Sequence, residues 1–127
     1  MNKQEILEEL NKFPFSPVEY WIIAGGAMVM HGVMEETADI DLGCTSKMAD
    51  RLEEQGFLKR RSPEGRRCFG IGELYEIFEE WLYDGTETVG GYRVITLQGL
   101  LEMKRELGRE KDMEDIKRIE EFMKRGE

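Results

Sequence analysis

Two acidic residues, one position apart, give the strongest chemical signal in the sequence. They lie in the segment Thr37-Ala38-Asp39-Ile40-Asp41-Leu42, and residues two apart on a β-strand point to the same face. We therefore expect Asp39 and Asp41 to project together, while Ile40 and Leu42 face the core. Neighbouring carboxylates repel each other unless a cation lies between them, and oxygen ligands favour Mg²⁺ or Mn²⁺. The alternative is a solvated acidic pair at the end of a strand, where Asp is common.

A glycine pair upstream of these acids favours the metal interpretation. The apolar segment 20–24 reads as a buried strand, Gly25-Gly26 breaks it, and residues 27–31 follow as a short helix. A strand that runs through glycines into a helix leaves backbone N–H groups free to bind a phosphate. The dinucleotide fingerprint and the P-loop motif are both absent from this turn.

Together these residues resemble the nucleotidyltransferase superfamily of the DNA polymerase β type, which has a Gly-Gly or Gly-Ser turn followed by an Asp-hydrophobic-Asp strand. The stretch from Ala24 to Gly32 reads AGGAMVMHG, and TADIDL begins at Thr37. This pattern is similar to the small stand-alone bacterial nucleotidyltransferases, including those of abortive-infection and toxin–antitoxin systems. The later stretches 93–95, 100–104 and 109–116 extend the resemblance to roughly residues 20–120.

The resemblance implies a third carboxylate on a later strand. Tyr75-Glu76-Ile77 fits the pattern of an acid flanked by hydrophobic residues, so Glu76 is the expected member, with Glu79 and Glu80 as alternatives in another register. An exposed strand glutamate is the competing interpretation. Three acids at one site would hold two metal ions for in-line transfer of a nucleotidyl group, with pyrophosphate as the leaving group. Glu76 would also serve as the base that takes the hydroxyl proton.

The substrates implied by the resemblance are an NTP and a hydroxyl acceptor. Gly25 and Gly26 would receive the phosphates, and Lys104 or Lys111 would reach the triphosphate. Helix-end charges and pairs spaced four residues apart explain these lysines nearly as well. A small molecule, a protein side chain and a tRNA end all remain open as the acceptor.

Two departures from the pattern favour a second hypothesis. Many relatives carry Arg at the position of Glu35, and Gly26 replaces a serine that would supply a hydroxyl to the phosphate turn. The second hypothesis is a nucleotidyltransferase-fold module without turnover that binds a nucleotide or a partner protein, as an antitoxin or a regulatory subunit would.

The elements that must position these residues follow from periodicity and turn signals. We expect one α/β (α+β) domain over residues 1–127, a nucleotidyltransferase fold with a small mixed sheet and helices packed on one face. The expected helices span residues 2–13, 27–31, 46–55, 97–107 and 111–125. The expected strands span residues 20–24, 38–44, 57–61, 66–71, 74–82 and 92–95, with a loop over 84–91. The glutamates of residues 74–82 also permit a helix there.

The hairpin predicted over residues 57–71 concentrates positive charge. Its basic residues are Lys59, Arg60, Arg61, Arg66 and Arg67. They would guide a nucleotide or an RNA end to the site, or else keep a solvated hairpin from pairing at its edge.

Composition limits the remaining classes. The chain has 127 residues, a formal charge of −9 and two cysteines. So acidic a protein is unsuited to non-specific duplex DNA binding, which depends on neutralising phosphates. Two cysteines are too few for a disulfide framework or a structural zinc site. The apolar runs are too short to span a bilayer, so a cytoplasmic protein is expected.

Overall fold

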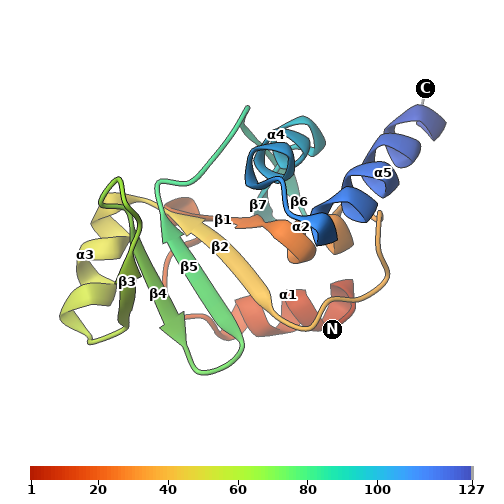
Figure 1. The fold of residues 1–127 in the computed structure, drawn as a ribbon. Helices are drawn as coiled ribbons and strands as arrows, with labels where there is room; N and C mark the ends of the chain where they lie inside the picture. The colour runs from red at the N-terminus through yellow and green to blue at the C-terminus, as the bar shows by residue number, and fades with distance from the viewer. Residues whose placement is uncertain (127) are drawn as a thin grey trace.

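Seven strands form one mixed sheet in the order β3-β4-β5-β2-β1-β7-β6. The structure is a computed structural model and describes residues 1–126 (Figure 1). The strands are β1 (Tyr20–Ile23), β2 (Ile40–Cys44), β3 (Leu58–Arg61), β4 (Arg67–Ile71), β5 (Tyr75–Glu79), β6 (Thr86–Val89) and β7 (Tyr92–Ile95). The helices are α1 (Lys3–Lys12), α2 (Ala24–Met30), α3 (Ser46–Glu54), α4 (Leu97–Leu107) and α5 (Glu110–Arg125), with a 3₁₀ turn at Pro17–Glu19. This mixed α/β architecture confirms the expected fold class.

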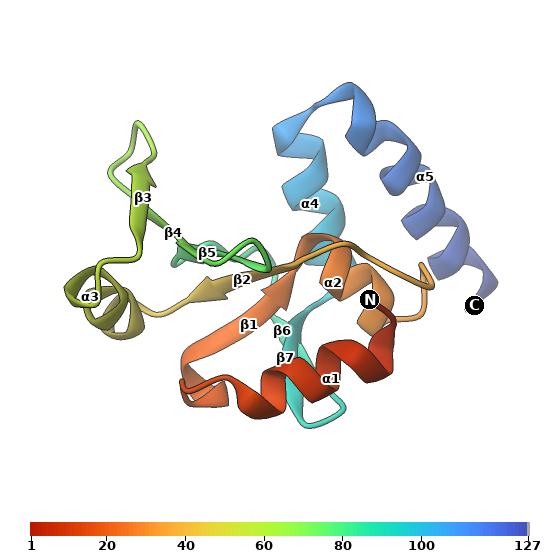
Figure 2. The ribbon, with the colours of Figure 1, turned by 90° about the horizontal axis from the view of Figure 1, so that it is seen from below.

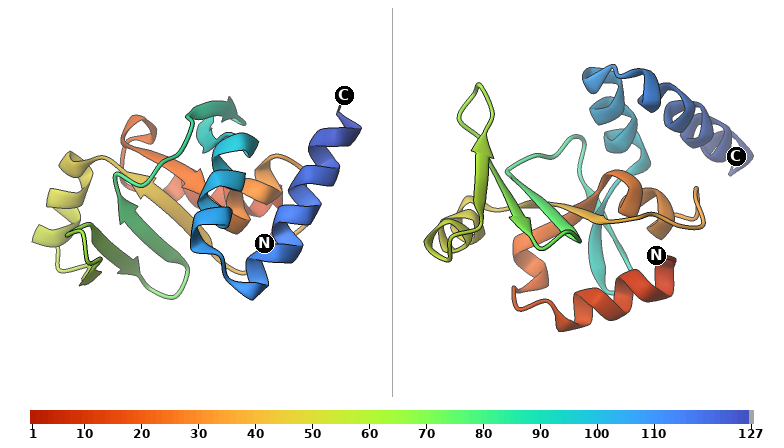
Figure 3. Two further views of the ribbon diagram at one scale, coloured as in Figure 1. Left: turned by 45° about the horizontal axis from the view of Figure 1, so that its top comes forward. Right: turned by 60° about the horizontal axis from the view of Figure 1, so that its bottom comes forward.

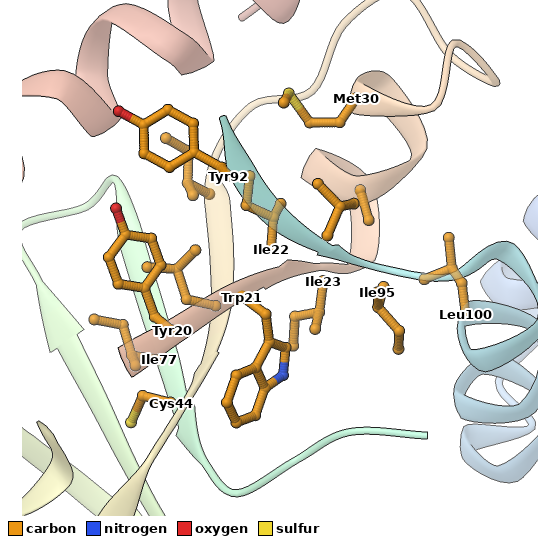
Figure 4. Close-up of a cluster of buried hydrophobic side chains, with 14 of the residues drawn as sticks. Tyr20, Trp21, Ile22, Ile23, Met30, Cys44, Ile77, Tyr92, Ile95 and Leu100 are labelled. Atoms are coloured by element: carbon orange, nitrogen blue, oxygen red, sulfur yellow. The ribbon is translucent and has the colours of Figure 1, made fainter. Parts of the chain in front are cut away.

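Three central strands determine which side chains share a face. β2 pairs with β1 antiparallel and with β5 in parallel, in a register that places Leu42 beside both Ile22 and Ile77. We call this side the covered face, because these three side chains are fully buried. The alternate residues lie on the opposite side, the open face, where Asp41 is the register partner of Glu76. Figure 4 shows part of the buried cluster around β1.

The helices divide between the two faces. The covered face packs against the α1 side of the molecule, where Phe13 stacks on Tyr75 with ring centroids 4.7 Å apart. On the other side of β1 stand α4 and α5, as Figure 2 shows. α4 and α5 form a helical hairpin joined at Gly108, which ends α4 in the left-handed conformation (Figure 3). The expectation of helices on one face therefore omits α4, which bounds the open face.

The sequence prediction missed one strand. The segment expected as a loop contains β6, which pairs antiparallel with β7. Gly90 and Gly91 both have positive φ (61° and 88°), which is the requirement of a tight two-residue hairpin turn. β6 is short and polar at the edge of the sheet, so it carries little hydrophobic periodicity to detect. Within residues 1–126, no helix combines the length and the apolar character needed to cross a membrane.

Candidate functional site

The central pair of acids lies on the open face of the sheet. Asp41 and Glu76 are opposite each other on the parallel strands β2 and β5. Ile40 and Leu42, on either side of Asp41, are fully buried on the covered face, so the strand is fixed in this register. Asp39 directly precedes β2 and is exposed. The expected alternation of acids and core residues is thus present in the structure.

The environment of Asp41 opposes its charge. Burial, followed by the nearby charges of Asp39 and Glu76, raises the pKa of Asp41 to about 7. Lys104 and Arg109 act in the opposite direction and do not compensate. None of the ion pairs among residues 1–126 includes Asp41. A half-buried carboxylate of this kind is stabilised by a bound cation, which acts against both burial and repulsion.

Glu76 differs from Asp41 because it already has cationic neighbours. The Nζ atom of Lys59 lies 3.1 Å from its Oε2 atom, and an Nη atom of Arg60 lies 3.7 Å from the same oxygen. These side chains are between 33% and 55% exposed, so the pairs are solvated and contribute little to stability.

The two alternatives for a third acid lie away from Asp41. Glu79 is on the covered side of β5, where its carboxylate accepts two hydrogen bonds from the guanidinium of Arg67. Glu80 accepts a hydrogen bond from the backbone N–H of Ser46 at the start of α3. Of the three glutamates considered, only Glu76 faces the aspartates.

Two hollows meet at the acidic pair. The first, the polar cleft, has a volume of about 590 Å³ and is lined by Asp39, Asp41, Lys59, Gly72, Glu73, Leu74, Tyr75, Glu76, Arg109 and Lys111. The second, the apolar pocket, has a volume of about 210 Å³ and is lined by Ala24, Asp41, Arg60, Glu76, Phe78, Trp81, Leu100, Met103, Lys104, Leu107 and Arg109. Asp41, Glu76 and Arg109 line both hollows, so a group held between them can be reached from two sides.

The two lysines expected to reach a triphosphate have different surroundings. Lys104 is only 7% exposed and pairs with Asp115 at 3.1 Å and Asp112 at 3.6 Å, between α4 and α5. Lys111 is exposed and lines the polar cleft. Lys104 therefore holds the two helices together at the wall of the apolar pocket, while Lys111 is free to meet a ligand.

Sequence reasoning did not select Arg109. Its Nε atom donates to Asp112 at 2.7 Å, and a second guanidinium nitrogen donates to the same carboxylate at 3.1 Å. Asp112 is 1% exposed, so this fork of hydrogen bonds holds Arg109 at the junction of the hollows. The stretch Arg109-Glu110-Lys111-Asp112 carries the signal, but only the turn between α4 and α5 shows which member faces the acids.

The glycine turn is built differently from the expectation. α2 begins at Ala24, three residues earlier than predicted, and Ala24 itself has the positive φ of 52°. A Cβ at Gly25 would lie 2.6 Å from the Oγ1 atom of Thr37, and one at Gly26 would lie 3.1 Å from Ile22. Both glycines therefore permit close packing, and Ala24 is the residue of this turn that lines the apolar pocket.

Comparison with known proteins adds the fold relationship. No family profile matches the sequence, and no curated protein matches it either. Among solved structures, the candidate nucleotidyltransferase TM1012 of Thermotoga maritima has a TM-score of 0.64 at 19% identity, over 92% of this chain and 93% of that one. The chain has the nucleotidyltransferase fold. ANT(2″)-Ia, solved in complex with adenylyl-2″-tobramycin, has a TM-score of 0.53 at 15% identity, over 92% of this chain and 83% of that one.

The acids on the open face are the candidate ligands for a divalent cation. Within residues 1–126, no three acidic, histidine or cysteine side chains are gathered closely enough to hold a metal ion as they stand. The donor chemistry nevertheless fits, because Asp41 and Glu76 are adjacent hard oxygen donors and, among the described residues, no cation forms an ion pair with Asp41. The ion pairs of Glu76 with Lys59 and Arg60 are solvated, and a cation bound beside Asp41 would compete with them for this carboxylate.

Proposed function

We propose that this chain is a nucleotidyltransferase that moves a nucleoside monophosphate from an NTP to a hydroxyl acceptor. The observation that carries the proposal is that Asp41 and Glu76 lie side by side on adjacent strands of the open face, where two hollows meet. A group-transfer enzyme must bring two substrates to one reacting centre, and two adjoining hollows provide separate approaches to it.

The acids are assigned to metal binding. Asp39, Asp41 and Glu76 would hold Mg²⁺ or Mn²⁺, whose chemistry is to polarise the phosphate oxygens and lower the pKa of the acceptor hydroxyl. The rise in the pKa of Asp41, caused by burial and by its acidic neighbours, supports this assignment. A cation at this position relieves the repulsion that burial imposes on the carboxylate.

The basic side chains of the polar cleft are assigned to the triphosphate. Lys59, Arg109 and Lys111 line this hollow together with the acids. Arg109 presents a planar guanidinium fixed by Asp112, which suits recognition of phosphate oxygens. Asp112 is therefore a positioning residue. Ala24, at the start of α2, is the residue of the glycine turn that lines the apolar pocket.

The transfer step conserves charge and atoms. The acceptor oxygen forms a bond to the α-phosphorus while the bond from that phosphorus to the oxygen bridging to the β-phosphorus breaks. Pyrophosphate leaves with the electron pair, and the hydroxyl proton passes to Glu76 or to solvent. The residues of the chain orient the two substrates in line and neutralise the charge that develops on the phosphates.

The test of this function is transfer of labelled nucleotide. Incubation of the protein with α-labelled NTPs, Mn²⁺ and a cell extract should label an acceptor, and Asp41→Asn should abolish the labelling while the variant stays folded by circular dichroism. Full labelling by Asp41→Asn would overturn the assignment. NTP and Mn²⁺ together should also raise the melting temperature of the wild type through preferential binding to the folded state.

A binding module without turnover is the second candidate. Two observations favour it: Glu76 already pairs with Lys59 and Arg60, and no complete acidic cluster is gathered within residues 1–126. This candidate predicts a shift in melting temperature with NTP and Mn²⁺ but no labelled product in any extract. It would act through a partner protein, as an antitoxin or regulatory subunit does.

A further inference from the structure

A third hollow adjoins the apolar pocket on the side away from the polar cleft. We call it the basic groove; it has a volume of about 130 Å³ and is lined by Arg60, Ser62, Arg66, Arg67, Cys68, Phe78 and Trp81. Arg60, Phe78 and Trp81 also line the apolar pocket. A ligand that lies across these three shared residues therefore extends from the basic groove to Asp41 and Glu76.

The arginines and lysine of the β3–β4 hairpin differ in their ion pairs. On the β3–β4 hairpin, Lys59 and Arg60 pair with Glu76, while Arg61 and Arg67 pair with acids that include Glu53. No carboxylate of residues 1–126 forms an ion pair with the fifth basic residue, Arg66. Its guanidinium instead lies 5.7 Å from the ring centroid of Trp81, in an otherwise acidic protein.

Trp81 offers a flat apolar surface beside this charge. Its ring is half-buried and packs against Phe78 with centroids 4.9 Å apart. The side chains of Leu100, Met103 and Leu107 continue the apolar wall toward the acids. Aromatic surface flanked by arginine is a combination that binds a stacked base and its phosphate.

We propose that the basic groove binds the acceptor, and that the acceptor is a nucleotide unit. Its base stacks on Trp81, its phosphate meets Arg60 and Arg66, and its ribose hydroxyl reaches the acidic pair. This inference rests on the proposed function, since the polar cleft is taken by the triphosphate. A cationic acceptor is disfavoured by the arginines. The nucleotide unit has two sources, a free mononucleotide or the 3′ end of a single-stranded RNA.

The first experiment measures binding without transfer. A ten-residue oligouridylate with a free 3′ hydroxyl, the same oligomer with a 3′ phosphate, and uridine 5′-monophosphate are titrated separately in EDTA. Tryptophan fluorescence is recorded, because a base stacked on Trp81 quenches it, whereas Trp21 is buried. We expect saturable quenching that weakens as salt rises. Absence of quenching by all three probes up to millimolar concentration overturns the proposal.

Variants then locate the binding. Binding to the variants is followed by the fluorescence anisotropy of the oligomer carrying a 5′ fluorescein, because Trp81→Leu lacks the reporter tryptophan. Trp81→Leu and Arg66→Ser should each weaken the dissociation constant about tenfold, and Arg66→Lys should recover part of the loss. Arg61→Ser is the matched control, because Arg61 is on the same hairpin but pairs with Glu53 outside the groove. An equal loss with Arg61→Ser would mean that the oligomer binds the positive charge of the hairpin in general, and it would overturn the assignment of its binding site to the basic groove.

The second experiment measures transfer onto the same probes. The oligomer with a free 3′ hydroxyl should accept label from an NTP with Mn²⁺, and the 3′-phosphate form should not, if an RNA end is the source. Label on the mononucleotide alone identifies a free mononucleotide as the acceptor. Binding without label on either probe, while another compound in the extract is labelled, overturns the acceptor assignment.

NTP binding is measured separately, so that the two proposals fail differently. Asp41→Asn should lose NTP and Mn²⁺ binding yet keep quenching by the oligomer. A wild type that does not bind NTP with Mn²⁺ refutes the proposed function, whatever the oligomer does. A tenfold loss of NTP binding in Arg66→Ser and Trp81→Leu assigns the groove to the NTP and refutes only the acceptor inference.

Discussion

Two glutamates of one strand, three residues apart, have opposite surroundings. Glu76 lies on the open face beside Asp41, whose pKa is raised to about 7 by burial and by its acidic neighbours. Glu79 lies on the covered side, where the guanidinium of Arg67 lowers its pKa to about 2. The same strand thus carries one acid in a group with excess negative charge and another in a group where the charges are matched.

The difference separates a group whose charges are matched from the acids that we propose bind a cation. Around Arg67, three carboxylates converge on one guanidinium, with distances of 2.9 Å to Asp50, 3.1 Å to Glu53 and 2.7 Å to Glu79. Around Asp41 the repulsion by Asp39 and Glu76 outweighs the attraction of Lys104 and Arg109, and no side chain of residues 1–126 forms an ion pair with it. The packing of the rest of the fold compensates the free energy of such repulsion, and a bound ligand of opposite charge relieves it.

The largest expected effect is the loss of nucleotidyl transfer when Asp41 is replaced. Asp41→Asn should lower nucleotidyl transfer by about 1000-fold or more, because the amide is a poor ligand for a hard cation. The same variant should be more stable than the wild type by about 1–3 kcal/mol at pH 7.5, because one pKa unit corresponds to about 1.4 kcal/mol. Urea unfolding in EDTA and the transfer assay measure the two effects.

Glu36→Gln is the control for this prediction. Glu36 is exposed in the segment that leads to β2 and lies outside the hollows. It should leave both activity and unfolding free energy unchanged. Destabilisation by Asp41→Asn would show that the carboxylate is a structural element and would remove the contrast between the two acidic regions.

The next largest effect is on stability at the matched group. Arg67→Met should destabilise the fold by about 2–4 kcal/mol, because it leaves Glu79 with its charge but without its partner. The side chains of Arg67 and Glu79 are 13% and 16% exposed, so solvent only partly replaces the lost contacts. Arg61→Met, which breaks an exposed pair with Glu53, should cost less than about 0.5 kcal/mol. Equal losses in urea unfolding would contradict this assignment.

The pH dependence of stability should report the same group. A carboxylate whose pKa is lowered on folding contributes stability that is complete above its unfolded pKa and disappears as pH falls through its folded pKa. For Glu79 that window runs from 4.5 down to about 2. Glu79→Gln should be less stable than the wild type by about 1–2 kcal/mol at pH 7, and the gap should close below pH 3.

Unfolding at several pH values, with Glu54→Gln as a control, measures this gap. Glu54 is an exposed acid on the same helix as Glu53. A gap between wild type and Glu79→Gln that stays constant from pH 7 to pH 2 would mean that Glu79 acts by packing rather than through its charge.

The sequence predicted the acids better than the bases, and the reason is physical. Ile40 and Leu42 must be buried, so the face of Asp41 follows from strand periodicity. The role of Glu76 remained one choice among three, because Glu79 and Glu80 have similar local sequence. The strand ends before Glu80, where the chain takes a positive φ of 50°, and this ending is set by tertiary packing.

Long basic side chains carry no such periodic signal. Lys104 and Lys111 were equivalent in the sequence, whereas the α4–α5 hairpin buries the first between two aspartates and leaves the second at the cleft. Arg109 follows the turn at Gly108, so its direction depends on how the two helices meet. Arg66 stands apart only once the partners of the other hairpin cations are known.

The smallest expected effect distinguishes these two lysines. Lys111→Ala should raise the KM for NTP about threefold with kcat unchanged, because an exposed ammonium contributes weak, salt-sensitive attraction to a triphosphate. Lys104→Met should instead lower stability, since it leaves Asp112 buried without one of its cationic partners.

Steady-state kinetics at two ionic strengths separates these roles, with Lys117→Ala as the control on the exposed side of α5. The effect of Lys111→Ala on KM should shrink at high salt, whereas the stability loss of Lys104→Met should persist because its ion pairs are buried. A drop in kcat for Lys111→Ala would place that lysine at the reacting phosphate rather than at the rim. The reacting centre would then include a residue of α5 as well as the acids of β2 and β5. The contrast with the Arg67 group would then be between the two faces of the sheet and not only between Glu76 and Glu79.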